Sequence, residues 1–448
     1  MKIDRNKLYK FLFAIGLLYF CFIILDVPKI EPQWEGYPDV IDYKAQSKES
    51  LTSLNFYATK PKENVWFFPR PFTVPLFFKM ASSDSYNMVM LQKTTYCICV
   101  ISLLIAILNF ISHFWVKIIA QCGLLFFFTW WNIVGWSDLP ISESLSISLL
   151  FFWFSTILFY YKKQSVLNII FLVISSILLS FTRDTWPYII LLFFLLNIFI
   201  SIFLSIGSIK KNVSLFVFSI CLFFAQSYTA NVGQRHWMPM FNSIAGRVAQ
   251  HDDYLAWFKN EGMPEADTLK TDFGEIKDLE LDGRVLISKR YCDSTYTNLF
   301  LWIMKDGKNK YQKFLLTHPY YFFLQDLSSE SVRGNLFSYN LPYYKGSEGF
   351  FVNADHVFPV FNVWFYLVFF LLLLFLFFKT KEIVYAFLAS VFILCVVNAL
   401  ITYNADALEI KRHLFITTII LEFISISTLI LLADYISNLV IKKPLKTL

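Results

Sequence analysis

The chain has 448 residues, of which 56% are hydrophobic, 19% are aromatic and only 16% are charged. In soluble proteins about a quarter of all residues are charged, so this composition excludes an ordinary soluble enzyme. The formal net charge of +6 is modest. Its positive residues fall in short turns between apolar stretches, so the chain gives no reason to expect a nucleic-acid partner.

The apolar residues gather in blocks of about 20, the length that an α-helix needs to cross a bilayer. The first block follows basic residues but lacks the small residues of a signal-peptide cleavage site, so we interpret it as a retained signal anchor. The sequence therefore predicts an all-α polytopic membrane protein with about ten transmembrane helices. The predicted helices are 8–27, 94–112, 114–134, 142–161, 166–181, 188–208, 214–230, 358–378, 383–403 and 414–432.

Two long polar segments divide the chain into three parts. Residues 1–230 form an amino-terminal transmembrane module that includes a first outer loop at 28–93. Residues 231–357 form an outer soluble segment, and residues 358–448 form the last transmembrane helices. The short turns on one side hold most of the lysines, so the positive-inside rule predicts that both termini are cytoplasmic and both long segments face outward. These lysines are Lys162, Lys163, Lys210, Lys211, Lys379 and Lys381.

The first outer loop contains two carboxylates three residues apart, Asp39 and Asp42, followed by Tyr43. A helix that begins near Asp39 would place both carboxylates on one face. Asp39 would then either cap that helix or act as a general base toward an acceptor hydroxyl. Arg70 lies further along, between prolines in an apolar stretch, where snorkelling to the membrane surface is the simplest explanation of a cation.

Charged residues also flank later helices on the predicted outer side. Glu143 lies in the first turn of the helix at 142–161, where a carboxylate suits the helix dipole but also marks the mouth of a membrane bundle. Arg183 and Asp184 occupy a short turn between two helices, and Lys411 and Arg412 precede the last helix. Guanidinium groups match phosphate with paired hydrogen bonds. These cations predict a lipid-phosphate ligand, with general interfacial anchoring as the alternative.

The second outer segment mixes charges, aromatic residues and turn formers, which predicts short helices lying over the bundle. Trp237 is the aromatic residue of this segment that we consider for the site, and an ordinary core aromatic is the alternative. The cysteines lie mostly in apolar blocks and form no cluster with histidines, so the sequence predicts neither a disulfide framework nor a metal site.

Taken in order, these features resemble the GT-C superfamily of membrane glycosyltransferases. The resemblance extends over roughly residues 1–210 and the last outer turn. In that last turn the family commonly has Arg-Tyr, and His413 departs from the pattern. The motifs that carry the resemblance are Asp39-Val-Ile-Asp42-Tyr43, Arg70-Pro-x-x-x-Pro-Leu-Phe, Ser142-Glu-Ser-Leu-Ser, the Arg183 turn and Lys411-Arg412-His413-Leu-Phe.

The resemblance implies an inverting enzyme that moves a sugar from a polyprenyl-phosphate carrier to a glycan, lipid or protein of the cell envelope. The composition, rich in Phe, Ile, Lys and Asn, is typical of an AT-rich bacterial gene, so the expected location is a bacterial inner membrane. Some family members bind a divalent cation, which is possible here. The alternatives are a lipid-linked polysaccharide polymerase or ligase and a lipid-oligosaccharide flippase, which would need charged residues along a path through the bundle.

The resemblance also implies roles for individual residues. Asp39, with Asp42 as the near alternative, would be the catalytic base. The residues expected to bind the donor phosphate are Arg183, Arg412, Lys411 and Arg70. Those expected to support the site or the acceptor are Tyr43, Glu143, Asp184 and Trp237.

Overall fold

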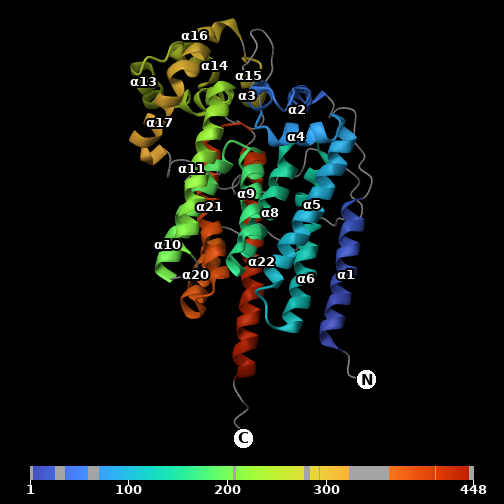
Figure 1. Cartoon of the computed structure of the whole chain (residues 1–448). Helices are drawn as coiled ribbons and strands as arrows, with labels where there is room; N and C mark the ends of the chain where they lie inside the picture. Colours follow the sequence, from blue (N-terminus) through green and yellow to red (C-terminus); the bar gives the residue numbers. More distant parts are fainter. Residues whose placement is uncertain are drawn as a thin grey trace.

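The structure is a computed structural model that describes residues 4–25, 36–58, 70–204, 208–276, 283–291, 293–321, 363–408 and 410–442. Throughout these residues every regular element is a helix. Ten of the helices stand side by side as a bundle (Figure 1). They are α1 (Arg5–Ile24), α5 (Ser85–Leu108), α6 (Phe114–Phe128), α8 (Ser142–Lys162), α9 (Val166–Ser180), α10 (Trp186–Leu204), α11 (Ile209–Val232), α20 (Val363–Thr380), α21 (Ile383–Ala405) and α22 (Ile410–Lys442).

Seven of the described helices are long and apolar enough to cross a membrane, and a bent pair, Phe114–Phe128 with Asn132–Asp138, makes an eighth. Two more, Val166–Ser180 and Trp364–Thr380, are apolar but shorter. The prediction of an all-α polytopic membrane protein is therefore confirmed. The count of ten spans stays a prediction.

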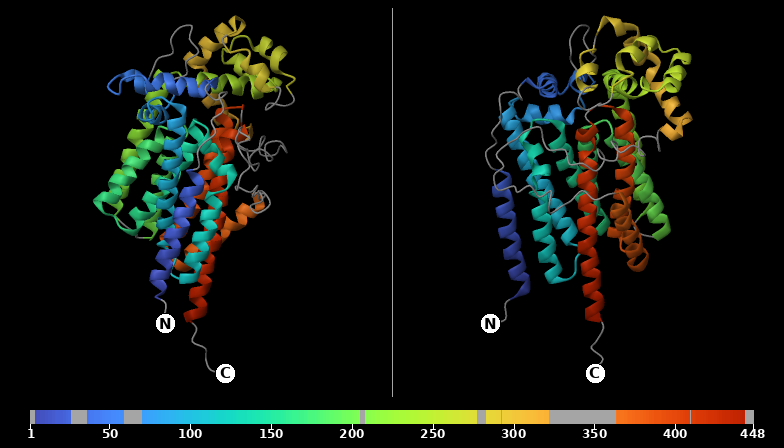
Figure 2. Two further views of the ribbon diagram at one scale, coloured as in Figure 1. Left: turned by 90° about the vertical axis from the view of Figure 1, so that its right-hand side faces the viewer. Right: turned by 180° about the vertical axis from the view of Figure 1, so that it is seen from behind.

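The two chain termini lie at one end of the bundle. The short helices α2 to α4 and α12 to α17 gather at the opposite end, which we call the distal end (Figure 2). Both segments predicted to leave the membrane therefore share one end, as the sequence predicts. Which end faces the cytoplasm stays a prediction.

Helices α8 and α22 form the centre of the bundle. In each of them, 83% of the most apolar stretch is buried by other parts of the protein. Helix α8 is rich in serine, whose small side chain allows helices to approach closely, and Ser155 of α8 contacts Ser102 of α5 through their hydroxyls, 2.8 Å apart. Since Glu143 and Arg412 lie in the first turns of α8 and α22, both residues are placed near the axis of the bundle.

One predicted helix is bent. The stretch 114–134 was expected to be continuous, but α6 ends at Phe128 and is followed by α7 (Trp131–Val134) and the 3₁₀-helix η2 (Gly135–Asp138). The two parts of this pair differ in direction by 53°. The bend carries Trp136 inward, where its ring stacks on Phe415 of α22 at 4.5 Å between centroids. Burial of this large aromatic favours the bend over a straight helix.

The first outer loop is shorter than predicted. Helix α5 begins at Ser85, because Asp84 caps it by accepting a hydrogen bond from the backbone N–H of Asn87 (2.8 Å). Lys93, expected to end the outer loop, lies inside α5, where it is buried and forms a 2.7 Å ion pair with Asp138 of η2. A lysine partnered in this way can lie within a bundle.

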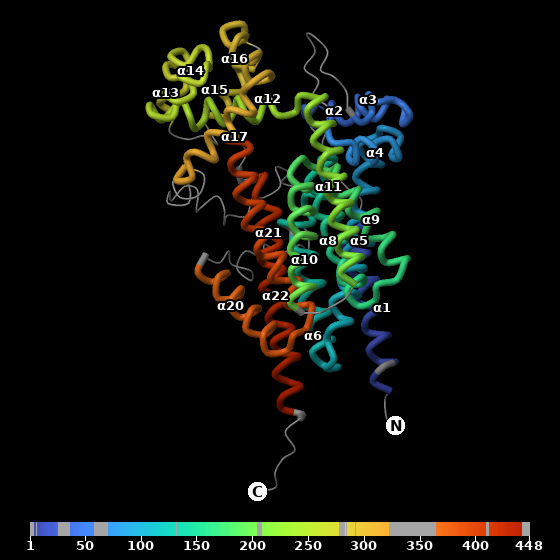
Figure 3. Tube along the Cα trace, turned by 60° about the vertical axis from the view of Figure 1, so that its left-hand side comes forward, coloured from blue at the N-terminus to red at the C-terminus, as the bar shows by residue number. Residues whose placement is uncertain are grey.

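The outer segment consists of short helices, as predicted, around an apolar core of its own that includes Phe241, Phe258 and Phe314. It lies over the distal ends of α11 and α21 (Figure 3). Its elements are α12 (Trp237–Ser243), the π-helix η3 (Ile244–Val248), α13 (Asp252–Asn260), α14 (Ala266–Phe273), α15 (Arg284–Ser288), η5 (Ser294–Tyr296), α16 (Thr297–Trp302), the π-helix η6 (Ile303–Gly307) and α17 (Lys308–Thr317). Residues 322–362, which include the rest of this segment, lie outside the described part of the chain.

Candidate functional site

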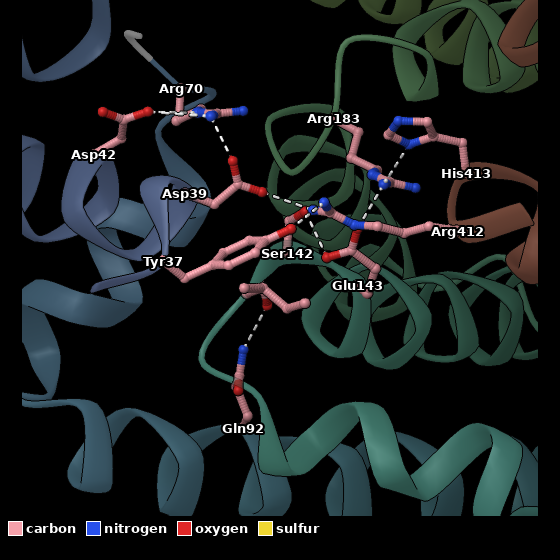
Figure 4. A network of polar contacts seen from close by, with 11 residues as sticks. Tyr37, Asp39, Asp42, Arg70, Gln92, Ser142, Glu143, Arg183, Arg412 and His413 are labelled. Atoms are coloured by element: carbon pink, nitrogen blue, oxygen red, sulfur yellow. Dashed lines mark hydrogen bonds and ion pairs between the residues drawn. The ribbon is translucent and has the colours of Figure 1, made fainter. Parts of the chain in front are cut away.

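Six charged side chains meet at the distal end of the bundle (Figure 4). They come from α2 (Pro38–Ser47), the residues before α4 (Thr73–Met80), the first turn of α8, the turn between α9 and α10, and the first turn of α22. We call this group the arginine–carboxylate cluster. Its members are Asp39, Asp42, Arg70, Glu143, Arg183 and Arg412.

The cluster is a chain of ion pairs in which carboxylates bridge arginines. Asp39 accepts from Nη2 of Arg70 at 2.5 Å and from Nη2 of Arg412 at 2.6 Å. Glu143 accepts from Nε of Arg412 at 2.6 Å and from Nη2 of Arg183 at 2.9 Å. Asp42 makes a further pair with Arg70 at 3.1 Å. Three positive charges are thus matched by three negative charges.

Solvent reaches only part of the cluster. The Glu143 side chain is fully buried and that of Arg412 is 6% exposed. The Arg70 side chain is 27% exposed, that of Arg183 is 16% exposed and that of Asp39 is 13% exposed. A ligand that approaches from outside therefore meets two guanidinium groups and one carboxylate first, with the buried pair beneath them.

Asp39 is positioned by the start of α2. Pro38 occupies the beginning of this helix, which suits its fixed φ angle, and Tyr37 stands at the N-cap without a side-chain cap. The expectation that Asp39 caps the helix is therefore wrong, because its carboxylate is engaged by arginines. Asp42 follows one turn later, and both carboxylates contact Arg70, so the predicted common face is observed.

Arg70 is held by α2 rather than snorkelling freely. Gln46 clamps its backbone: the side-chain amide donates to the carbonyl of Arg70 at 2.8 Å, and its oxygen accepts from the N–H of Arg70 at 2.8 Å. The ring of Tyr43 lies 5.8 Å from the guanidinium carbon of Arg70. A few residues on, the backbone N–H of Thr73 donates to the carbonyl of Phe181 at 3.0 Å. The first outer loop is thereby tied to the turn that carries Arg183.

Glu143 is positioned by α5. Gln92 donates to the backbone carbonyl of Ile141 at 2.8 Å, just before α8 begins. The neighbouring Lys93 holds Asp138 in the buried ion pair described above. These two contacts fix the chain that leads into the first turn of α8, and Ser142 adds a 3.2 Å hydrogen bond to Glu143 itself.

The electrostatic environment keeps Asp39 and Arg70 ionised. Burial opposes the ionisation of Asp39, but the charges of Arg70 and Arg412 outweigh it and hold the pKa of its carboxyl below the usual value. Burial also opposes the charged form of Arg70, whereas Asp39 raises the pKa of Arg70 above its usual value. In this arrangement Asp39 is a weak base and Arg70 is fully charged.

Three residues predicted for the site lie elsewhere or are not described. Asp184 accepts from Gln226 at 2.5 Å and from Arg235 at 2.9 Å, so it joins the Arg183 turn to the outer segment. Trp237 packs edge-on against Tyr291 and Phe300 in the core of the outer segment, which fits the alternative of an ordinary core aromatic. The side chain of Lys411 lies outside the described part of the structure.

Two residues that were not predicted for the site also contact the cluster. The hydroxyl of Tyr37 accepts from Nη1 of Arg412 at 3.0 Å. His413, noted only as a departure from the family pattern, has Nδ1 3.2 Å from Nη2 of Arg183. Since a guanidinium only donates hydrogen bonds, Nδ1 is the acceptor and the proton of the neutral ring sits on Nε2. The position of Tyr37 two residues before Asp39 is the only sequence signal for it, because its partner Arg412 is distant in the sequence.

Among the described residues, no group of three histidine, cysteine or carboxylate side chains lies close enough together to hold a metal ion. No protein-family model matches the chain, and no curated protein matches it. The fold and the cluster define the class: an integral membrane protein with a helical bundle that carries a buried, charge-balanced cluster of arginines and carboxylates at one end.

Proposed function

We propose that the chain is a membrane glycosyltransferase of the GT-C type. It transfers a sugar from a polyprenyl-phosphate carrier to an envelope glycan, lipid or protein, on the outer face of what we take to be a bacterial inner membrane. The observation that supports this most is the convergence of Asp39, Asp42 and three arginines, from elements far apart in the sequence, at one end of a lipid-embedded bundle.

The arginines suit a lipid phosphate. Guanidinium groups bind phosphate oxygens through paired hydrogen bonds, and Arg70 and Arg183 are the more exposed cations of the cluster. Since the cluster is already charge-balanced, an incoming phosphate competes with carboxylates for these cations. Asp39 is the partly exposed carboxylate that bridges Arg70 and Arg412, so it is the one that a phosphate at the outer edge displaces.

Displacement would activate Asp39. Its pKa is held low by the two arginines, and a phosphate that takes over their hydrogen bonds removes that stabilisation, so the carboxylate becomes a stronger base. Asp39 then accepts the proton of the acceptor hydroxyl, while the oxygen of that hydroxyl attacks the anomeric carbon of the donor sugar. The bond from that carbon to the phosphate oxygen breaks, the electron pair leaves with the phosphate, and the configuration inverts. The arginines stabilise the departing charge.

The distribution of lysines supports an outward-facing site. The predicted cytoplasmic turns lie at the end of the termini, and the cluster lies at the distal end (Figure 1). An outward site suits a donor carried by a membrane lipid, because nucleotide sugars are scarce outside the cell.

The proposal is tested by replacing Asp39 and Asp42 with asparagine, singly and together, in the host and analysing its envelope glycans by mass spectrometry. A general base contributes about 10²- to 10⁴-fold, so we expect transfer to fall by at least about 100-fold in Asp39→Asn or in the double variant, with normal membrane insertion. Asp434→Asn is the matched control, since Asp434 is a buried carboxylate near the opposite end of the bundle.

Normal transfer by both single variants and by the double variant would contradict the proposal. If the variants instead leave single repeat units on the surface, the chain is a polymerase. In reconstituted vesicles, a lipid-linked sugar that crosses the bilayer without a new glycosidic bond would identify a transporter.

A further inference from the structure

The outer segment holds the loop that leads into Arg412. Arg247, in the π-helix η3, donates hydrogen bonds to the backbone carbonyls of Tyr403 and, at 3.1 Å, of Asp406. Its guanidinium carbon lies 3.6 Å from the centroid of the Tyr403 ring. Asn242 donates to the carboxylate of Asp406 at 2.9 Å. Tyr403 lies in the last turn of α21 and Asp406 is its C-cap, so these contacts hold the carboxyl end of α21, a few residues before Arg412.

Two more contacts join the end of α21 and the residues after it to the outer segment. The hydroxyl of Tyr311 donates to the carbonyl of Asn404 at 3.0 Å. Leu408 belongs to the apolar core of the outer segment rather than to that of the bundle. Arg247 is itself 5% exposed. The carboxyl end of α21 and the residues after it are therefore packed against the outer segment, and Figure 3 shows the distal end of α21 beneath α12 and α17.

The outer segment also contacts the turn that carries Arg183. Asp184, its neighbour, accepts from Nε and Nη2 of Arg235 at 3.1 and 2.9 Å. Arg235 lies between α11 and α12, at the start of the outer segment, and its side chain is 5% exposed. Arg183 and Arg412 share Glu143. The outer segment holds the residue after Arg183 and the chain a few residues before Arg412.

From these contacts we infer that the outer segment is a positioning element of the donor site, with Arg247 as the positioning residue for Arg412. The inference rests on the proposed function insofar as the ligand of the arginines is a lipid phosphate. Charge-charge recognition depends steeply on distance, and a displacement of about 1 Å can cost about 100-fold in a well-oriented site. A ligand that binds the outer segment and alters these contacts would therefore change the affinity of the protein for the donor. By linkage, the donor would change the affinity of the protein for that ligand by the same factor.

The test uses the full-length protein in nanodiscs, with farnesyl phosphate as the probe and farnesol as its uncharged counterpart. The variants are Arg247→Met, Arg247→Lys and the milder Asn242→Ala. Tyr296→Phe is the control, because it removes a partly buried 2.8 Å hydrogen bond to Asp272 that is made within the outer segment and does not involve the end of α21. Hydrogen exchange of residues 403–414 reports the position of the loop without any ligand.

We expect Arg247→Met to speed exchange at 403–414 and to weaken farnesyl phosphate binding, each by about tenfold or more, because two hydrogen bonds from a buried guanidinium are lost. Farnesol binds as weakly to the variant as to the wild type, so the loss is specific to the phosphate. Arg247→Lys recovers part of the loss, Asn242→Ala shows a smaller loss, and Tyr296→Phe shows none.

The inference is overturned if folded Arg247→Met exchanges and binds like the wild type, or if Tyr296→Phe causes an equal loss. If Arg247→Met does not fold, Asn242→Ala decides by the same two readouts. If the wild type itself fails to bind farnesyl phosphate, the proposed function is wrong, and the exchange of residues 403–414 alone decides whether Arg247 positions the loop.

Discussion

Buried carboxylates occur at both ends of the bundle, but their partners differ. Near the termini, Asp434 of α22 accepts hydrogen bonds from the backbone N–H groups of Ser112 and His113, at 3.1 and 2.8 Å, and from the Ser112 hydroxyl. All of these donors are neutral and come from the start of α6. At the distal end, Asp39 and Glu143 are bridged by guanidinium groups.

The difference separates a structural carboxylate from candidate functional ones. Asp434 acts as a cap, because it accepts hydrogen bonds from backbone N–H groups at the start of a helix. These backbone donors are fixed in place by the fold and occupy the carboxylate. The distal carboxylates are matched by flexible cations, two of which are partly exposed. Such pairs can exchange one anion for another, because the guanidinium groups keep their charge when a phosphate replaces a carboxylate.

The largest effect is expected for Glu143→Gln. This change leaves Arg183 and Arg412 without their shared buried anion, and breaking a buried pair by removing one partner costs about 3–5 kcal/mol. The apparent melting temperature and the SDS-unfolding midpoint in detergent should both fall clearly below those of the wild type. Unchanged midpoints would mean that the cluster is not a coupled network.

The ion pair of Lys93 and Asp138 sharpens the comparison, because it lies beside the cluster yet contains no arginine. Lys93→Met alone should destabilise by about 3 kcal/mol, since Asp138 is left as a poorly compensated charge. Adding Asp138→Leu should restore most of the loss, because apolar packing can replace a buried pair. A double variant no more stable than Lys93→Met would show that the two residues do not act as a pair.

Asp39→Asn should cost about 2 kcal/mol at neutral pH, the typical worth of hydrogen bonds to charged groups. The folded pKa of Asp39 lies below its unfolded value of about 3.9. Its stabilisation is therefore complete above the unfolded pKa and is lost as the pH falls through the lower, folded pKa. The stability difference between wild type and variant should stay constant from pH 7 to about pH 5 and narrow below about pH 4. A difference that already shrinks near pH 6 would show that arginines do not stabilise the charge.

The smallest effect is expected for Asp434→Asn, because the amide oxygen of asparagine can accept most of the same hydrogen bonds. We expect a loss of about 1 kcal/mol in the same unfolding assays. A loss as large as that of Glu143→Gln would remove the distinction between the two ends of the bundle.

Hydropathy alone located the helices of the bundle, since lipid requires apolar stretches of a known length. It misplaced the start of α5, because Lys93 is polar in sequence yet paired in the fold. It also missed the bend after Phe128, which depends on where Trp136 packs. Both errors come from contacts with elements distant in the chain.

The cluster was predicted in part. Residue type and sidedness singled out Asp39, Glu143 and the arginines, and the spacing of Asp39 and Asp42 fits their shared contact with Arg70. The partners of each residue could not be predicted, because Arg412 and Asp39 are separated by 373 residues. For the same reason the contact between Asp184 and Arg235 of the outer segment could not be predicted.

The central claim is that the distal arginines form a site for a lipid phosphate. The most direct measurement is the binding of farnesyl phosphate to the purified full-length protein in nanodiscs, compared with farnesol and with the Arg70→Gln and Arg183→Gln variants. We predict saturable binding of the phosphate, binding weakened by about tenfold or more in each variant through loss of a charged hydrogen bond, and little binding of farnesol. Equal binding of phosphate and alcohol, or wild-type affinity in both variants, would contradict the claim.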